Sequence, residues 1–234
     1  MLAVFKRDLR SYFTSPIGYV FIAVFLIIAN LFFYMYNILS QTSDMTNLFA
    51  NLLFILSFLL PILTMRLFSE ELRQKTDQLL LTAPVSIGKV VVGKYLACLA
   101  VFVIAILLTL TWPLVVTMYG HPALYTIVGN YAGLFFAVAA FIAIGLFISA
   151  LTESQLIAAV ITFAVYLGLY LMASLTSAVQ NDFLRKILNW ISVFSRYRHL
   201  SLGLFALDDI LYYISLIVIF LFLTDRVLER KRWA

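Results

Sequence analysis

The chain has 234 residues, of which 64% are hydrophobic and only 12% are charged, and its mean hydropathy is +1.05. A soluble globular domain is about half apolar and about a quarter charged, so this composition excludes a water-soluble fold. The net charge of +5 would suit a nucleic-acid binder, but the sixteen Lys and Arg residues fall in short clusters between long uncharged stretches. Such clusters are typical of contacts with lipid headgroups. We therefore expect membrane lipid, and no nucleic acid, as a partner.

The first 15 residues have the pattern of an amphipathic helix. Apolar side chains recur at helical spacing from Leu2 and Phe5 to Leu9 and Tyr12. The basic residues Lys6, Arg7 and Arg10 lie off this stripe. The pattern predicts a helix that lies in the membrane interface, and the proline at position 16 lets the chain turn there into a span.

Six stretches approach the roughly 20 apolar residues that a membrane-spanning helix needs. We place the spans at residues 17–39, 48–66, 95–119, 131–151, 155–179 and 208–225. The sequence thus predicts an all-α membrane protein, a single domain over residues 1–234 with six transmembrane helices.

Basic residues are distributed unevenly over the segments between these spans. The N-terminal segment, the connection between spans two and three, and the C-terminal tail carry three, five and four Lys or Arg. The connections at residues 40–47 and 120–130 carry none. The segment after span five breaks the pattern with four on the outer side, which leaves twelve basic residues inside against four outside. Because positive loops stay in the cytoplasm, we expect a multi-pass protein of the cytoplasmic membrane with both termini inside.

Residues 69–83, with the sequence SEELRQKTDQLLLTA, form the most polar stretch on the inner side. Leu72, Thr76 and Leu79 share one helical stripe, and Pro84 follows as a helix breaker. The pattern predicts a short helix outside the bilayer, parallel to its surface. From the residues alone, this helix either presents itself to a cytoplasmic partner or is a solvated link between two spans.

Residues 181–207 follow span five on the outer side. Their aromatic and aliphatic residues recur at helical spacing: Phe183, Ile187, Trp190, Ile191 and Phe194. The pattern predicts one or two short helices that dip into the outer leaflet. Arg196 and its basic neighbours are costly at that depth unless they are paired or reach water.

The sequence shows no catalytic constellation. His121 and His199 have no second ligand at metal spacing, so we expect no catalytic residue and no metal site. No Asp, Glu, Lys or Arg occurs at residues 96–152 or 154–181. Ion-coupled transporters generally place ionisable groups in their spans. Energy for transport is therefore expected to enter through a partner.

A few polar side chains do occur within the spans. They include Asn30 and hydroxyl groups such as those of Thr64 and Thr109. The amide of Asn30 is expected to hydrogen-bond between helices, since polar side chains join neighbouring helices in a membrane.

Three runs of residues stand close together at positions 66–71 (RLFSEE), 79–86 (LLLTAPVS) and 93–96 (GKYL). They resemble the signature connection of type-2 ABC exporter permeases, most closely the short, six-span gliding-motility-type branch. The outer segment at 194–213 and the close of the chain at 226–230 also look like that branch. The resemblance covers essentially the whole chain.

In that family, the segment between spans two and three is the coupling helix, which lies in a groove of the ATPase subunit. The resemblance gives this role to residues 69–83, with ATPase-coupling residues Glu70, Glu71, Leu72, Arg73, Lys75, Thr76, Asp77, Leu79 and Leu80. Family members often have Gly-Thr and then Glu where this chain has Lys-Thr-Asp at 75–77. The missing glycine predicts a more regular helix.

Two further segments take roles from the resemblance. Residues 1–15 would be the elbow helix, for which the candidate residues are Phe5, Lys6, Arg7 and Arg10. Residues 181–207 would be the extracellular re-entrant helices.

The resemblance also implies partners. These are two cytoplasmic ABC ATPase subunits, which bind ATP and Mg, and a second permease copy or paralogue. The chain itself would be a non-catalytic subunit without a cofactor, and its spans one, two and five would line the substrate route. Two alternatives stay open. One is a mechanotransmission complex, with an extracellular domain on a companion subunit, and the other is an ion-coupled secondary transporter.

Overall fold

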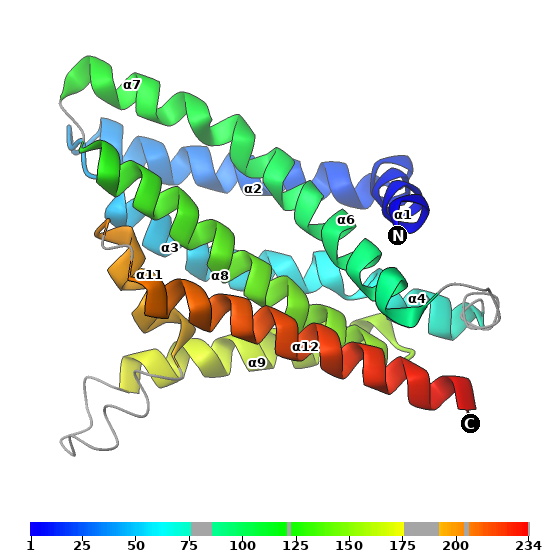
Figure 1. Cartoon of the computed structure of the whole chain (residues 1–234). Coiled ribbons are helices and arrows are strands. Elements are labelled where there is room, and N and C mark those ends of the chain that lie inside the picture. Colours follow the sequence, from blue (N-terminus) through cyan, green and yellow to red (C-terminus); the bar gives the residue numbers. More distant parts are fainter. Residues whose placement is uncertain (76–85, 121–122, 176–191, 204–205, 234) are drawn as a thin grey trace.

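The structure is a computed structural model of the chain and describes residues 1–75, 86–120, 123–175, 192–203 and 206–233 (Figure 1). Every regular element in these ranges is helical. Among the described residues, six helices are long and apolar enough to cross a membrane, and they fall on the six predicted stretches. The prediction of helices alone, with six of them able to span a membrane, is confirmed for the described part of the chain.

In chain order the helices are α1 (Leu2–Thr14), α2 (Pro16–Phe33), the π-helix η1 (Tyr34–Ile38), α3 (Thr46–Thr64), α4 (Arg66–Gln74), α6 (Ile87–Leu107), the 3-10 helix η2 (Leu108–Leu110), α7 (Thr111–Tyr119), α8 (Leu124–Leu151), α9 (Gln155–Leu175), α11 (Val193–Ser201) and α12 (Leu207–Trp233). The candidate spans are α2 with η1, α3 with α4, α6 through α7, α8, α9, and α12.

Several helices extend beyond the apolar stretches that predicted them. α6 begins at Ile87, α8 begins at Leu124, and α12 continues to Trp233. A helix satisfies its own backbone hydrogen bonds and can therefore continue from lipid into water. Hydropathy marks only the apolar part of each helix, which explains why the predicted spans are shorter.

α8 lies at the centre of the bundle, where 78% of the residues in its most apolar 18-residue stretch are buried. Its small residues let neighbouring helices approach closely, as is common in membranes. A Cβ atom added at Gly145 would lie only 2.4 Å from Thr64 Oγ1 on α3. By contrast, only 17% of the residues in the corresponding stretches of α9 and α12 are buried, and 28% of those in the stretch of α2. The apolar faces of these three helices therefore point away from the bundle.

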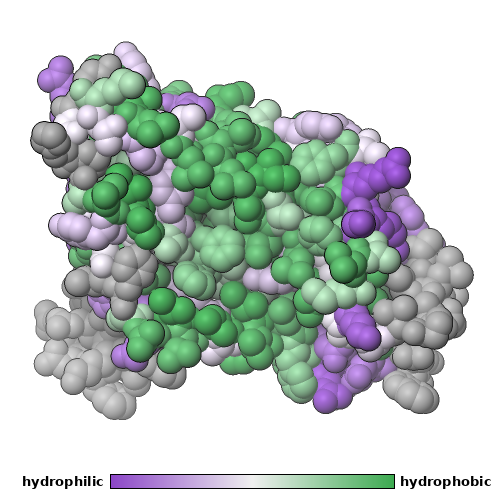
Figure 2. Space-filling model, turned by 45° about the horizontal axis from the view of Figure 1, so that its top comes forward, coloured by the Kyte–Doolittle hydropathy of each residue, from purple (hydrophilic) through white to green (hydrophobic). Residues whose placement is uncertain are grey.

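The two ends of the bundle differ in polarity. The end that carries both chain termini, α1 and α4 lies at the right of Figure 1, and we call it the terminal end. The opposite end carries η1, α7 and α11, and we call it the distal end. Figure 2 shows hydrophobic residues across the middle of the surface and hydrophilic residues gathered at the right, on the terminal end. This distribution fits a bilayer around the middle.

Polar side chains within the spans bond between helices. Trp112 Nε1 on α7 donates to Asn30 Oδ1 on α2 at 2.9 Å, which confirms the predicted role of Asn30. The hydroxyl group of Thr109 lies 3.2 Å from that of Tyr131 on α8.

At the distal end, α11 covers part of the predicted outer segment. Arg196 is almost fully buried, and its Nη1 lies 3.0 Å from Asp209 Oδ1 on α12. Its guanidinium group also stacks 4.4 Å above the Tyr212 ring. The sequence required that Arg196 be paired or reach water at this depth, and Asp209 is its partner. Residues 181–191 and 204–205 of the predicted outer segment lie outside the described part of the chain, as do residues 176–179 of the predicted span five.

Candidate functional site at the terminal end

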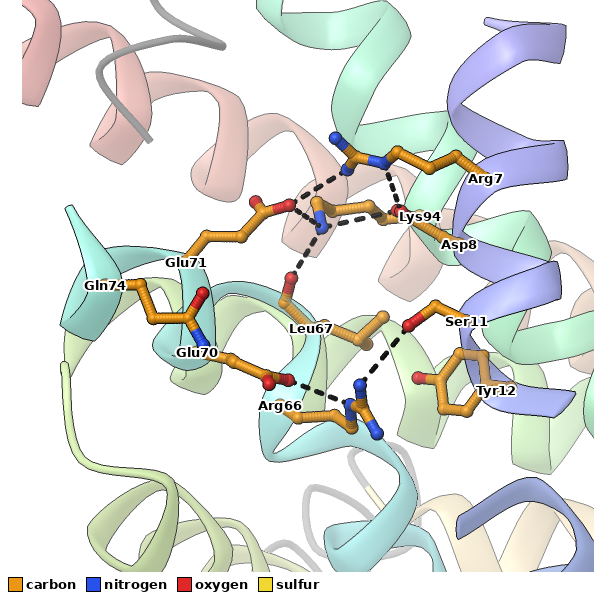
Figure 3. Close-up of a pocket in the computed structure, with 10 residues that line it drawn as sticks. All are labelled: Arg7, Asp8, Ser11, Tyr12, Arg66, Leu67, Glu70, Glu71, Gln74 and Lys94. Atoms are coloured by element: carbon orange, nitrogen blue, oxygen red, sulfur yellow. Dashed lines mark hydrogen bonds and ion pairs between the residues drawn. The ribbon is translucent and has the colours of Figure 1, made fainter. Parts of the chain in front are cut away.

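Four charged side chains from three helices meet at the terminal end (Figure 3). Glu71 Oε1 of α4 lies 2.9 Å from Arg7 Nη2 of α1 and 3.0 Å from Lys94 Nζ of α6. Asp8 of α1 completes the group, with Oδ1 2.8 Å from Arg7 Nε and Oδ2 3.3 Å from Lys94 Nζ. We call these four residues the charged cluster. Its two acids balance its two bases.

Lys94 is the most buried member of the charged cluster, with 4% of its side chain exposed. An ammonium group has three N–H donors. Nζ of Lys94 donates to the carbonyl oxygen of Leu67 at 2.8 Å and forms ion pairs with Glu71 and Asp8. A buried charge is tolerated only when it is paired and hydrogen-bonded. Lys94 meets this condition and ties α6 to α1 and α4.

Arg7 lies at the exposed edge of the charged cluster, with 49% of its side chain accessible. Burial acts to lower the pKa of Arg7, but hydrogen bonds and charges from Asp8 and Glu71 outweigh it and raise the pKa. The guanidinium group therefore stays charged at any physiological pH.

The junction between α3 and α4 is fastened from α8. Ser149 Oγ accepts hydrogen bonds from the backbone N–H groups of Phe68 and Ser69 at 3.0 and 3.1 Å. It also donates to the carbonyl oxygen of Met65 at 2.9 Å. The first N–H groups of a helix have no acceptor within the helix. Ser149 thus caps α4 from another span.

α1 fastens the same junction from its other side. Tyr12 is buried, and its hydroxyl group donates to the carbonyl oxygen of Leu63 at 2.9 Å. Arg66 at the start of α4 donates to the hydroxyl groups of Ser15 and Ser11 at 3.0 and 3.3 Å. Helices α1, α6 and α8 therefore all hold the chain where α3 passes into α4.

A cavity of about 260 Å³ lies between α1, α4 and α6 (Figure 3). Its lining residues are Arg7, Asp8, Ser11, Tyr12, Arg66, Leu67, Glu70, Glu71, Gln74 and Lys94. The acids and bases in this lining pair with one another. The described residues also contain no group of His, Cys, Asp and Glu placed to hold a metal ion. The arrangement is suited to joining helices.

The predicted coupling residues fall into two groups. Four lie on α4 and one ends it: Glu70, Glu71, Leu72, Arg73 and Lys75. The other four lie outside the described residues: Thr76, Asp77, Leu79 and Leu80. Within the first group, Glu70 pairs with Arg66 at 3.0 Å, Leu72 is buried, and Arg73 borders a second cavity of about 400 Å³ beside Glu153.

The predicted elbow residues are also spread out. Arg7 joins the charged cluster, Lys6 and Arg10 are exposed, and Phe5 is half-buried. α1 packs closely on α6, where a Cβ atom at Gly93 would lie 3.2 Å from Val4. The helix is therefore fixed to the bundle along much of its length.

The prediction of a more regular helix at position 75 is wrong. α4 ends at Gln74, and Lys75 takes the left-handed conformation, with φ 55° and ψ 22°. This conformation commonly ends helices and is usually adopted by glycine, which has no Cβ to clash. Lys75 therefore has the backbone that the family's glycine would adopt without strain.

Sequence reasoning missed Asp8, Lys94 and Ser149. Lys94 was only one of five basic residues in its connection, and a serine in an apolar span gives no signal. Asp8 did carry a signal, because it is the one acid among the first 15 residues, beside three bases. An acid on the basic side of such a helix indicates a cation on another helix.

A comparison with curated proteins finds no similar sequence. A family model described as "ABC-2 family transporter protein" matches residues 2–233, which is nearly the whole chain. Membrane subunits of this family are typically non-catalytic, generally bind no cofactor, and imply an ABC ATPase as a partner. The resemblance of the sequence to ABC permeases is thus confirmed at the level of the family. The chain belongs to the ABC-2 family of transporter proteins, as a membrane-spanning permease subunit.

Proposed function

We propose that this permease exports its substrate across the cytoplasmic membrane, and that α4 with the segment after it is the coupling helix. That helix receives movement from a cytoplasmic ABC ATPase subunit. The observation that carries the proposal is the charged cluster, because it joins α4 to α1 and α6 through short ionic contacts. A displacement of α4 must move both of these helices or break the cluster.

The cost of breaking the charged cluster makes this connection stiff. Removing one partner of a buried ion pair typically costs about 3–5 kcal/mol, because the other charge is left unpaired. α1 leads directly into α2, which is span one, and α6 is the first part of span three. Movement at α4 would therefore reach spans one and three, as well as span two, to which α4 itself belongs.

Ser149 gives the movement a fourth destination. Its three hydrogen bonds connect the start of α4 to α8, the buried centre of the bundle. α9 follows α8 after a short turn, and only 17% of the residues in its most apolar stretch are buried. We infer that a push on α4 tilts the outer helices around this centre.

The proposed complex contains two permease chains and two ATPase subunits, which bind ATP and Mg. Six spans supply half of a pathway, and the apolar faces of α2 and α9 are free for a second copy and for lipid. The route between the halves is assigned to spans one, two and five. The terminal end is assigned to the cytoplasm, since the basic residues of α1, α4, the start of α6 and the end of α12 gather there.

The first experiment tests coupling. The tagged permease is purified with its native complex, and the ATPase subunit that accompanies it is identified by mass spectrometry. Glu71→Gln is expected to lower the ATP hydrolysis of the assembled complex severalfold. Glu229→Gln is the matched control, because it removes the same charge from an exposed pair with Arg226 on α12. Equal hydrolysis by wild type and Glu71→Gln would contradict the proposed role of α4.

A second experiment tests sidedness. Cys98 is the one native cysteine and is buried, so Cys98→Ala with Arg73→Cys gives a single accessible thiol on α4. A membrane-impermeant maleimide is expected to label it only in inside-out vesicles. Labelling in intact cells would place α4 on the outer side and rule out a cytoplasmic ATPase contact there.

A further inference from the structure

The distal end contains a cavity that lies away from the charged cluster. Its volume is about 180 Å³, and it lies between η1 with the following turn and α7. The lining residues are Phe33, Asn37, Ile38, Gln41, Thr42, Val115 and Val116. Ile38 is 40% exposed on the apolar surface, so the cavity borders the region that faces lipid. We call it the distal cavity.

Asn37 is the buried polar residue of the distal cavity, with 4% of its surface exposed. Its Nδ2 group donates to the backbone carbonyl oxygens of Thr42 and Asp44, each at 3.1 Å. Carbonyl oxygens only accept hydrogen bonds, so the amide of Asn37 cannot be turned around. The orientation of its Oδ1 atom is therefore fixed as well.

No donor to Asn37 Oδ1 occurs among the residues that the structure describes, although this atom is buried. A buried acceptor without a donor is costly, and native proteins satisfy the great majority of such atoms. A ligand that brings an O–H or N–H group to this atom would remove the cost. The chemistry of the distal cavity thus selects a hydrogen-bond donor.

The backbone around Asn37 departs from regular helix in two places. η1 is a π-helix, in which Leu39 N–H donates to the carbonyl oxygen of Tyr34 at 2.8 Å. Gln41 has a positive φ of 50°, which is uncommon outside glycine. Single π-turns occur frequently at functional sites, because they reposition a side chain within a helix. Here the π-turn carries Asn37.

Most of the remaining lining of the distal cavity is apolar. Phe33, Ile38, Val115 and Val116 form this apolar part, and Gln41 and Thr42 complete the lining. An apolar cavity of about 150 Å³ can hold a molecule the size of benzene. The distal cavity is of similar size, so it has room for one ring or a short chain beside the acceptor.

We propose that the distal cavity binds an amphiphile that donates a hydroxyl or N–H hydrogen bond to Asn37 Oδ1 and rests its apolar part on the surrounding walls. Such a group can come from a lipid of the adjacent leaflet or from a dissolved alcohol or phenol. The site is independent of the ATPase contact, because it lies at the opposite end of the bundle.

Trp112 supplies a built-in reporter. It is 3% exposed, and its ring stacks on that of Phe33, a wall of the distal cavity, at 5.2 Å between centroids. The chain has three tryptophans, so Trp190→Phe with Trp233→Phe leaves Trp112 as the one fluorophore of its kind. A bromine atom quenches tryptophan fluorescence only near contact, so quenching measures occupancy of the distal cavity.

The experiment titrates this purified variant with 4-bromophenol and with 4-bromoanisole, which lacks the O–H donor. Saturable quenching by 4-bromophenol is expected, with an affinity about fivefold or more above that of 4-bromoanisole, as one hydrogen bond implies. Asn37→Leu removes the acceptor at similar size, and the two probes should then bind equally. Equal quenching of the parent by both probes would overturn the proposal.

Further variants guard against a folding defect, because Asn37→Leu also removes the two bonds to the turn. Val115→Phe fills the distal cavity while leaving Asn37 in place, and it should abolish saturable quenching by both probes. Val128→Phe, at an exposed position on α8, is the control and should change nothing. Unchanged quenching in Val115→Phe would show that the probes bind elsewhere, and would also overturn the proposal.

A lipid arm distinguishes the two sources. The same variant is reconstituted in phosphatidylcholine vesicles that contain either brominated phosphatidylglycerol, whose headgroup has hydroxyl donors, or brominated phosphatidylcholine, which has none. Stronger quenching by the phosphatidylglycerol, lost in Asn37→Leu, assigns the site to a lipid. Equal quenching by the two lipids, with selectivity for 4-bromophenol retained, assigns it to a dissolved amphiphile.

Discussion

The two ends of the bundle both bury charge, but they connect different parts of the chain. At the terminal end, the charged cluster joins residues 8, 71 and 94, which come from α1, α4 and α6. At the distal end, Arg196 and Asp209 join α11 to α12, which follow each other in sequence. A link between distant segments transmits displacement across the bundle. A link between neighbouring segments only holds a local fold. We therefore expect that removing a charge affects coupling at the terminal end and stability alone at the distal end.

Lys94→Met tests the terminal end, and we expect it to have the largest effect of the variants considered. The apolar side chain leaves Asp8 and Glu71 facing each other without their buried cation, and the expected destabilisation is about 3–5 kcal/mol. ATP hydrolysis by the assembled complex should fall together with thermal stability in detergent. Lys89→Met, at an exposed position on the same helix, is the control. If the Lys94 variant kept full coupling, the charged cluster would not be a transmission element.

Asp209→Asn tests the distal end. It leaves the buried Arg196 without its carboxylate, and we expect a loss of roughly 3 kcal/mol in stability. Hydrolysis per folded complex should stay unchanged, because α11 and α12 would loosen without moving α4. The measurement is thermal unfolding beside hydrolysis normalised to folded protein. A matching fall in normalised hydrolysis would erase the distinction between the two ends.

Ser149→Ala sharpens the comparison within the terminal end. The variant removes one donor and one shared acceptor, and leaves the N–H groups of Phe68 and Ser69 unsatisfied at the start of α4. An unsatisfied buried group costs about 1–3 kcal/mol. Coupling should weaken while ATPase association is retained, since no exposed residue of α4 changes. Association is measured by pull-down and coupling by hydrolysis, with Ser174→Ala on α9 as the control. Loss of association would instead indicate that Ser149 shapes the docking surface.

The same comparison explains what the sequence could and could not predict. The six spans were predictable because each depends on one continuous apolar stretch, and so was the need of Arg196 for a partner, because charge at bilayer depth is costly. The charged cluster was not, since Asp8, Glu71 and Lys94 meet only through the packing of α1 on α6. Lys94 in particular looked like another basic residue in a connection, although the helix carries it into the interior.

Lys75→Gly has the smallest expected effect and the opposite sign. The left-handed backbone at position 75 costs a residue with a Cβ atom roughly 1–2 kcal/mol, and glycine adopts it freely. Glycine is also more flexible in the unfolded chain, which offsets part of the gain. We therefore expect a net stabilisation of at most about 1 kcal/mol, seen as a small rise in the midpoint of thermal unfolding. Lys75→Ala removes the same charge without relieving the backbone and is the matched control. A gain shared by both variants would trace the effect to charge, and a loss in Lys75→Gly alone would show that the flexibility of glycine in the unfolded chain outweighs the relief of the backbone.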